Sequence, residues 1–71
     1  MMDKDEMAIM DFDHAITIDP EDKSLYNYRG FAEAELKNYA GAKKDFEKAL
    51  SMDPNYKDPY MNRGIMYIWM E

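Results

Sequence analysis

Cysteine is absent from this chain of 71 residues, and proline and glycine occur only three times each. Without cysteine the chain can form neither a disulfide framework nor a thiolate metal site. Long apolar runs are absent as well, since no stretch approaches the roughly 20 residues that a membrane-spanning helix requires. Stability must therefore come from packing alone, and a core of this size supplies no more than about 3–5 kcal/mol.

Positive charge is also scarce. Nine Lys and Arg residues are scattered among fifteen Asp and Glu residues, which gives a formal net charge of −6. Nucleic acids and anionic membrane surfaces are bound by clustered Lys and Arg, so we expect neither as a partner. The N-terminal residues 1–6 are acidic and lack the basic region and apolar core of a signal peptide. A cytoplasmic location is the expectation.

The chain does contain a repeat with a period of 34 residues, at which ten residues recur identically. The first set is Ala8, Asp11, Phe12, Ala15, Asp19, Pro20, Lys23, Tyr26, Arg29 and Gly30; the second is Ala42, Asp45, Phe46, Ala49, Asp53, Pro54, Lys57, Tyr60, Arg63 and Gly64. Small, aromatic and proline positions recurring at this period are typical of stacked helical hairpins.

Turn signals at residues 19–22, 37–39 and 53–56 divide the chain into four segments of helical length. We predict helices over 3–18, 23–36, 39–52 and 57–71, because apolar residues follow the helical period and strand patterns are absent. Asp22 is predicted to cap the second helix, and Asp58 with Pro59 to begin the fourth. The predicted fold class is all-α, with four helices arranged as antiparallel hairpins.

Glycines within two of these helices predict close packing. Gly30 and Gly64 each cost about 1 kcal/mol relative to alanine, so we expect a neighbouring helix to approach both closely. The small residues facing them and the large aromatic residues between them should interdigitate. These are Ala8, Ala15, Ala42 and Ala49, with Phe12, Tyr26, Phe46 and Tyr60. Among the methionines, Met7, Met10 and Met52 are expected in the core, and Met66 and Met70 on an adaptable binding surface.

Residues 23–56 resemble one complete tetratricopeptide repeat. The matching residues are Tyr26, Arg29, Gly30, Tyr39, Ala42, Phe46, Ala49, Leu50, Asp53 and Pro54. Residues 1–22 resemble only the second helix of a preceding repeat, and residues 57–71 only the first helix of a following one. The resemblance implies a single domain with an α–α superhelix, in which one whole repeat lies between two halves.

Three residues depart from the family pattern. Glu33 stands where an aromatic residue is usual, Lys43 replaces an apolar residue, and Lys37 replaces a common turn glycine. An ion pair between Glu33 and Lys43 across the hairpin is one consequence that the sequence allows.

The resemblance also implies a function, because the first helix of each repeat in this family lines a concave groove that holds a peptide or a partner protein. The residues it nominates here are Asn27, Tyr28, Phe31, Ala34, Glu35, Met61, Asn62, Ile65, Ile68 and Trp69. The alternative is that Phe31, Ile65 and Ile68 are simply core. No groove lysine accompanies Asn27 and Asn62, so we expect an apolar or amphipathic segment as ligand rather than an acidic tail.

No catalytic site, cofactor or metal is expected. Ser24 and Ser51 lack a histidine partner at a predictable offset, and no glycine-rich phosphate loop follows a strand. The single histidine, His14, lies beside Asp11 and Asp13, but a metal site needs several converging ligands, so we interpret it as a surface residue. The chain is therefore predicted to be a binding protein and not an enzyme.

A second hypothesis concerns self-association. The C-terminal segment is apolar on all sides, which favours a covered helix. Ile65, Ile68, Trp69 and Met70 are expected to form the contact, and a homodimer is favoured among homo-oligomers. Head-to-tail docking, a two-fold dimer and a helix swap through residues 37–39 all remain open. The alternative function is a structural self-assembling unit, or an excised or designed fragment of a longer array, with no ligand of its own.

Overall fold

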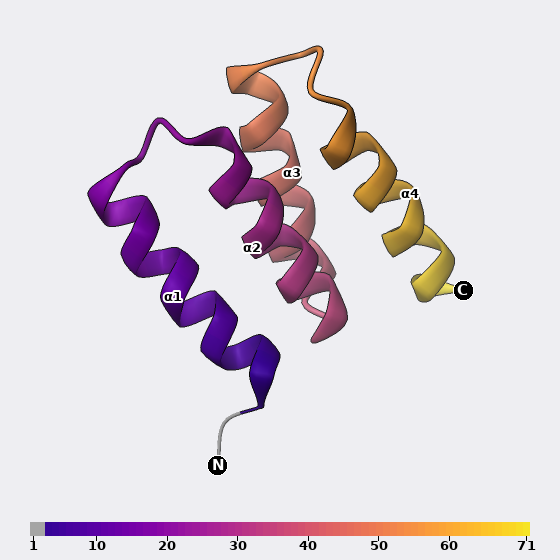
Figure 1. Ribbon diagram of the computed structural model, residues 1–71. Coiled ribbons are helices and arrows are strands. Elements are labelled where there is room, and N and C mark those ends of the chain that lie inside the picture. The colour runs from indigo at the N-terminus through magenta and orange to yellow at the C-terminus, as the bar shows by residue number, and fades with distance from the viewer. Residues whose placement is uncertain (1–2) are drawn as a thin grey trace.

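The computed structural model describes residues 3–71 as four helices, α1 (Lys4–Ile18), α2 (Lys23–Glu35), α3 (Tyr39–Met52) and α4 (Lys57–Met70). The helices lie in chain order across a flat molecule of 36 × 34 × 15 Å, with α1 and α4 on the outside (Figure 1). The all-α helical hairpin fold predicted from the sequence is confirmed. Met1 and Met2, which belong to the predicted first half repeat, lie outside the described residues.

The helix starts follow from side-chain caps at three of the four helices. Asp3, Asp22 and Asn38 each accept a hydrogen bond from a backbone N–H of the first turn, as helix N-caps do. The prediction for Asp22 is therefore confirmed. The prediction that Asp58 caps α4 is wrong, because Tyr56 occupies the N-cap position and its side chain makes no capping bond. Asp58 and Pro59 lie two positions further into the first turn than predicted, as the second and third helical residues, where a missing proline N–H still costs no helical bond.

A tight turn joins α2 to α3. Lys37 has a φ of 66°, the left-handed conformation that glycine adopts most readily. Its N–H bonds to the carbonyl of Ala34 at 3.0 Å, and the N–H of Asn38 bonds to the carbonyl of Glu33 at 2.8 Å. This pair of bonds is the Schellman motif that ends many helices. Lys37 thus takes the conformation of the turn glycine that it replaces.

The core lies between α2 and α3, where small and large side chains interdigitate as predicted. Phe46 and Ala42 of α3 are 0% exposed. A Cβ atom at Gly30 would lie 2.8 Å from the Phe46 ring and 3.2 Å from the carbonyl oxygen of Ala42, so the predicted close approach at Gly30 is confirmed. The same prediction for Gly64 is wrong, because nothing in residues 3–71 lies within 4 Å of a Cβ placed there.

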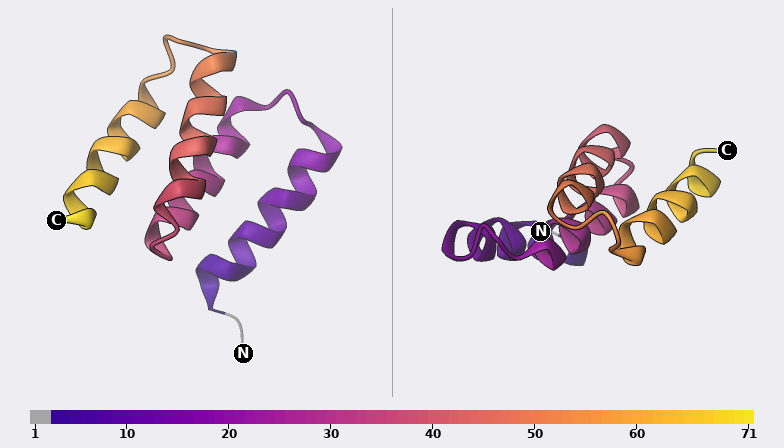
Figure 2. Two further views of the ribbon diagram at one scale, coloured as in Figure 1. Left: turned by 180° about the vertical axis from the view of Figure 1, so that it is seen from behind. Right: turned by 90° about the horizontal axis from the view of Figure 1, so that it is seen from above.

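Several methionines occupy places other than those predicted. Met7 and Met10 are 55% and 56% exposed, and no residue of α1 is buried. Met66, predicted on a binding surface, is 1% exposed and belongs to the core with Phe46. The reason is geometric: α4 contacts α3 and Met66 packs with Ala42 and Phe46 of that helix, whereas α1 contacts only α2 among the described helices. Figure 2 shows α1 at the edge of the molecule.

None of the helices in residues 3–71 combines the length and the hydrophobicity that crossing a bilayer would require. Within the same residues, His, Asp and Glu side chains do not gather in threes as a metal ion would need.

Candidate functional site

A groove of about 530 Å³ lies on the side of α2 between α1 and α4. This volume is within the range of small-ligand and peptide pockets. Its lining residues are Asp5, Ala8 and Phe12 of α1, then Asn27, Tyr28, Phe31, Ala32 and Glu35 of α2, and Asp58, Met61 and Asn62 of α4. We call this hollow the groove.

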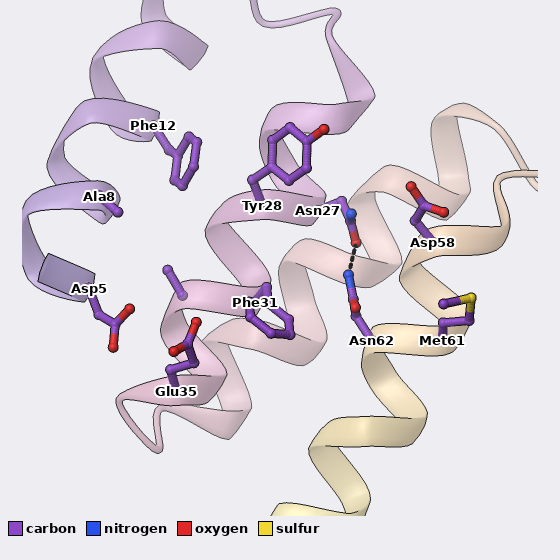
Figure 3. Close-up of a pocket in the computed structure, with 11 residues that line it drawn as sticks. Asp5, Ala8, Phe12, Asn27, Tyr28, Phe31, Glu35, Asp58, Met61 and Asn62 are labelled. Atoms are coloured by element: carbon purple, nitrogen blue, oxygen red, sulfur yellow. Dashed lines mark hydrogen bonds between the residues drawn. The ribbon is translucent and has the colours of Figure 1, made fainter.

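Aromatic rings form the centre of the groove. The ring of Phe12 lies 5.9 Å from that of Tyr28, measured between centroids, and so joins α1 to α2. Phe31 lies deeper and meets Trp69 of α4 edge to face at 5.5 Å. Figure 3 shows Phe12 and Tyr28 side by side, and Phe31 further along α2 on the side of Glu35 and Asn62. An apolar side chain entering the groove would therefore meet ring faces from two helices.

An amide pair joins α2 to α4 at the edge of this aromatic surface. The Nδ2 group of Asn62 donates to Oδ1 of Asn27 at 3.0 Å (Figure 3). Asn27 is only 2% exposed, so its amide fixes the position of α4 against α2. Asn62 is half-buried and faces the groove. The pair is thus a structural contact as well as part of the groove wall.

The charges at the groove are all negative. Asp5 and Glu35 lie at one end and Asp58 at the other, and the lining includes no lysine or arginine (Figure 3). Partial burial, and then the nearby charge of Asp5, raise the pKa of Glu35 above its usual range. The groove therefore combines an apolar floor with a negative rim.

Most of the groove residues predicted from the sequence do line the groove. Asn27, Tyr28, Phe31, Glu35, Met61 and Asn62 contribute to its walls. Trp69 lines a second, smaller hollow of about 300 Å³ together with Glu35. Ala34 also lines that second hollow, and Ile65 and Ile68 line neither of the two. The positions are thus known, but ligand binding by these residues stays a prediction.

Sequence reasoning missed the wall that α1 contributes. Asp5, Ala8 and Phe12 are spaced three and four residues apart, so they share one face of a helix. That spacing could have identified them. The family resemblance instead directed attention to the first helix of each repeat, and α1 is a second helix.

The predicted self-association residues lie along the last turns of α4. Ile68 is 66% exposed, Met70 is 51% exposed, and Trp69 is 41% exposed although its ring meets Phe31. Ile65 is half-buried. Three of the four are therefore accessible on one molecule.

A buried ion pair lies behind the groove, between α2 and α3. Nε and Nη2 of Arg29 donate to the two carboxylate oxygens of Asp45 at 2.8 and 2.7 Å, and Nη1 donates to Asp13 of α1 at 2.8 Å. Asp45 is 6% exposed. These bonds, with Asp45 first, raise the pKa of Arg29 above its already high usual value. Arg29 thus links three helices.

Glu33 lies close to this ion pair without joining it. Its Oε1 atom is buried without a hydrogen-bond partner, and Oε2 accepts only a long bond of 3.4 Å from Asn38. Lys43 is exposed and forms no ion pair among residues 3–71, so the Glu33–Lys43 pair that the sequence allowed does not form. Loss of hydration, followed by the proximity of Asp45, raises the pKa of Glu33 from its usual 4.5 to about 8.

This raised pKa predicts a specific pH dependence of stability. Below pH 4.5 Glu33 is protonated in the folded and the unfolded chain. Between pH 4.5 and about 8 the unfolded chain releases this proton while the folded chain retains it, so the free energy of unfolding should fall as pH rises. We expect Glu33→Gln to abolish this dependence and to stabilise the fold at pH 9 by about 1–2 kcal/mol. The gain is no larger because the carboxyl is only partly buried and solvent screens its charge.

The measurement is urea unfolding of wild type and Glu33→Gln at pH 4, 6, 7.5 and 9. Glu47 lies on α3 with its side chain exposed, so Glu47→Gln is the matched control and should leave the slope between pH 4.5 and 8 in place. Equal slopes for wild type and Glu33→Gln would show that Glu33 titrates alike in the folded and unfolded chains, and would contradict the prediction.

Comparison with known proteins identifies the part of the chain that builds α2 and α3. The family model of the tetratricopeptide repeat matches residues 24–56. Comparisons with curated proteins and with solved structures gave no match. The matched residues include the Gly30–Phe46 packing and the Arg29–Asp45 pair described above. Residues 24–56 of this chain are therefore similar to a tetratricopeptide repeat, a family whose members are generally protein-interaction modules.

Proposed function

We propose that this chain is a non-catalytic interaction module whose groove holds an apolar segment, flanked by basic residues, of a partner protein. The observation that carries the proposal is the combination of an aromatic floor with a rim whose charged groups are all carboxylates. Rings and thioether groups bind apolar side chains and do not react with them. In this proposal residues 1–22 and 57–71 act as halves of neighbouring repeats, and the cytoplasmic location stays a prediction.

The negative rim determines the chemistry of the partner. Asp5, Glu35 and Asp58 would repel an acidic peptide and attract lysine or arginine on either side of an apolar core. Tyr28 and Met61 are 50% and 63% exposed, so they can cover such a core without any rearrangement of the helices. An amphipathic helix or an extended segment with one apolar face fits this description.

The experiment compares two synthetic peptides with the same apolar core, one flanked by lysines and one by glutamates. Each is titrated into the labelled chain, and backbone amide shifts are followed by nuclear magnetic resonance at low protein concentration. We expect the lysine-flanked peptide to shift the amides of Tyr28, Phe31 and Met61 in a saturable way. It should bind at least about tenfold more tightly than the glutamate-flanked peptide.

Matched variants assign the binding to the groove. Met61→Glu places a charge on the groove wall, whereas Met10→Glu changes a methionine of similar exposure on α1 outside the groove. We expect the first variant to abolish binding and the second to leave it unchanged. The proposal would be overturned if neither peptide moves groove amides, if the acidic peptide binds more tightly, or if Met61→Glu binds as wild type does.

A further inference from the structure

Helices α2 and α3 pack against each other, whereas α1 and α4, which carry the equivalent residues, do not contact each other within residues 3–71. The sequence of α1 repeats that of α3, and the sequence of α4 repeats that of α2, each at a distance of 34 residues. Figure 2 shows α1 and α4 as the two outer helices, with α2 and α3 between them. Each outer helix therefore carries one half of the α2–α3 interface.

On α4, positions that are covered in α2 are open. Tyr26 is 8% exposed and its equivalent Tyr60 is 48% exposed, although both hydroxyls donate to the carbonyl of a proline six residues earlier. Gly30 lies against the Phe46 ring, whereas Gly64 has open space where that ring would be. The face of α4 that contains Gly64 is thus shaped like the face of α2 that receives α3.

On α1, positions that are buried in α3 are only partly covered. Phe46 and Ala49 of α3 are 0% exposed, whereas their equivalents Phe12 and Ala15 are half-buried. The ring of Phe12 meets that of Tyr28 and stays partly exposed. The remaining side of α1 carries the residues with which α3 packs on α2.

The charges of the two open faces are complementary. In the α2–α3 hairpin the guanidinium of Arg29 binds both oxygens of Asp45. The equivalent residues are Arg63 on α4 and Asp11 on α1. Among residues 3–71 the guanidinium of Arg63 lies over the ring of Tyr60 and forms no ion pair, and Asp11 is exposed.

A second ion pair shows the same relation. Lys23 at the start of α2 pairs with Asp53 at the end of α3. The equivalent residues, Lys57 and Asp19, are both exposed, and neither forms an ion pair within the described part of the chain. Two independent pairs of opposite charge are therefore divided between the outer helices at the same spacing.

We propose that α1 of a second copy docks on α4 as α3 docks on α2, so that copies assemble head to tail. Asp11 of the second copy would then bind Arg63, Asp19 of the second copy would bind Lys57, and Phe12 of the second copy would lie over Gly64. The connection over residues 19–22 repeats the connection over 53–56, so α2 of the second copy follows as α4 follows α3. The two faces differ, so the assembly extends or closes into a ring.

This contact goes beyond groove binding, because it uses a different face of α4. Asn62 and Met61 face the groove, whereas Gly64 and Arg63 are absent from its lining. It also differs from a two-fold dimer centred on Trp69, since the ring of Trp69 packs against Phe31 of its own chain.

Charge reversal tests the proposal. The mass of the chain is measured by sedimentation velocity from micromolar to millimolar concentration, and we expect it to increase with concentration. Arg63→Glu and Asp11→Arg each place like charges at the interface and should weaken association at least about tenfold. The double variant, and an equimolar mixture of the two single variants, should recover association, because opposite charges then face each other again. Met10→Glu, which changes an exposed side chain equivalent to the exposed Lys44, is the control and should associate as wild type does.

A variant at Gly64 separates assembly from folding. Gly64→Ala meets nothing within 4 Å in one molecule, so it should retain or slightly raise the stability of the dilute chain. At the interface, by analogy with Gly30, the added methyl group would collide with Phe12 of the second copy and reduce association.

Three results would overturn the proposal. The first is a monomer at every concentration. The second is an oligomer that keeps its association constant in Arg63→Glu and in Gly64→Ala. The third is association that fails to recover in the double variant, which would show that Arg63 and Asp11 do not meet.

Discussion

Replacing Arg29 with methionine is expected to destabilise the fold by about 3–5 kcal/mol, because the change leaves a buried carboxylate without its partner. Asp45 is 6% exposed and receives two hydrogen bonds from this one guanidinium, at 2.8 and 2.7 Å. The Asp13 contact with α1 is lost as well. The expected loss is similar to the whole net stability of a domain of this size, about 3–5 kcal/mol. Urea unfolding followed by far-ultraviolet circular dichroism should show little or no cooperative transition.

Two further variants identify the cause. Arg63→Met makes the same substitution 34 residues later, at an arginine that forms no ion pair within residues 3–71, and should change stability by no more than about 0.5 kcal/mol in dilute solution. The double variant Arg29→Met, Asp45→Leu removes both charges and should recover most of the loss, because no unpaired charge then remains buried. Similar losses for Arg29→Met and Arg63→Met would show that side-chain packing, not the ion pair, supplies the effect.

The repeat was sufficient to predict the fold. Identical residues at Tyr26 and Tyr60, or at Phe12 and Phe46, indicated that the same hairpin was used again, and the turns at proline and Lys37 placed the helices to within one residue at each end. The prediction for Gly30 was correct for the same reason, since glycine within a helix needs a close neighbour to explain it.

The errors have one common cause, which is that equal residues do not have equal surroundings. Gly64 repeats Gly30 but has no helix over it, and Met7 and Met10 belong to a helix covered on one side only. Met66 was assigned to a surface because the last segment is apolar on all sides, and sequence alone does not show which side meets α3. Whether a residue is buried depends on the position of its helix among the four. A 34-residue repeat in the sequence does not specify which helices are covered by neighbours on both sides.

The candidate site was predicted in part for a related reason. Tyr28, Phe31 and Asn62 were found because the family resemblance names their helices as groove-forming. The wall from α1, with Phe12, and the negative rim required the relative placement of three helices. The pairing of Asn27 with Asn62 likewise depends on a distance between helices that no spacing in the sequence encodes.

Replacing Phe46 with alanine should have an effect as large as that of Arg29→Met, about 3–5 kcal/mol. Phe46 is 0% exposed, and its ring fills the space that Gly30 leaves on α2. Removing the ring opens a cavity between two helices that meet through small residues, so the helices cannot close it by side-chain rearrangement alone. We expect a chain that retains helical circular dichroism but loses cooperative urea unfolding and shows poorly dispersed amide resonances.

Phe12→Ala is the matched control, because Phe12 is the same residue 34 positions earlier and is only half-buried against Tyr28. Its expected cost in dilute solution is about 1–2 kcal/mol, as for a partly buried aromatic ring. Equal losses for the two variants would mean that α1 contributes to the core as much as α3 does. That result would contradict the prediction, which rests on the difference in burial between Phe12 and Phe46. A larger loss at Phe46 would show that the α2–α3 hairpin holds the fold together. The two outer helices then keep faces that are less important for folding and available for contact with other molecules.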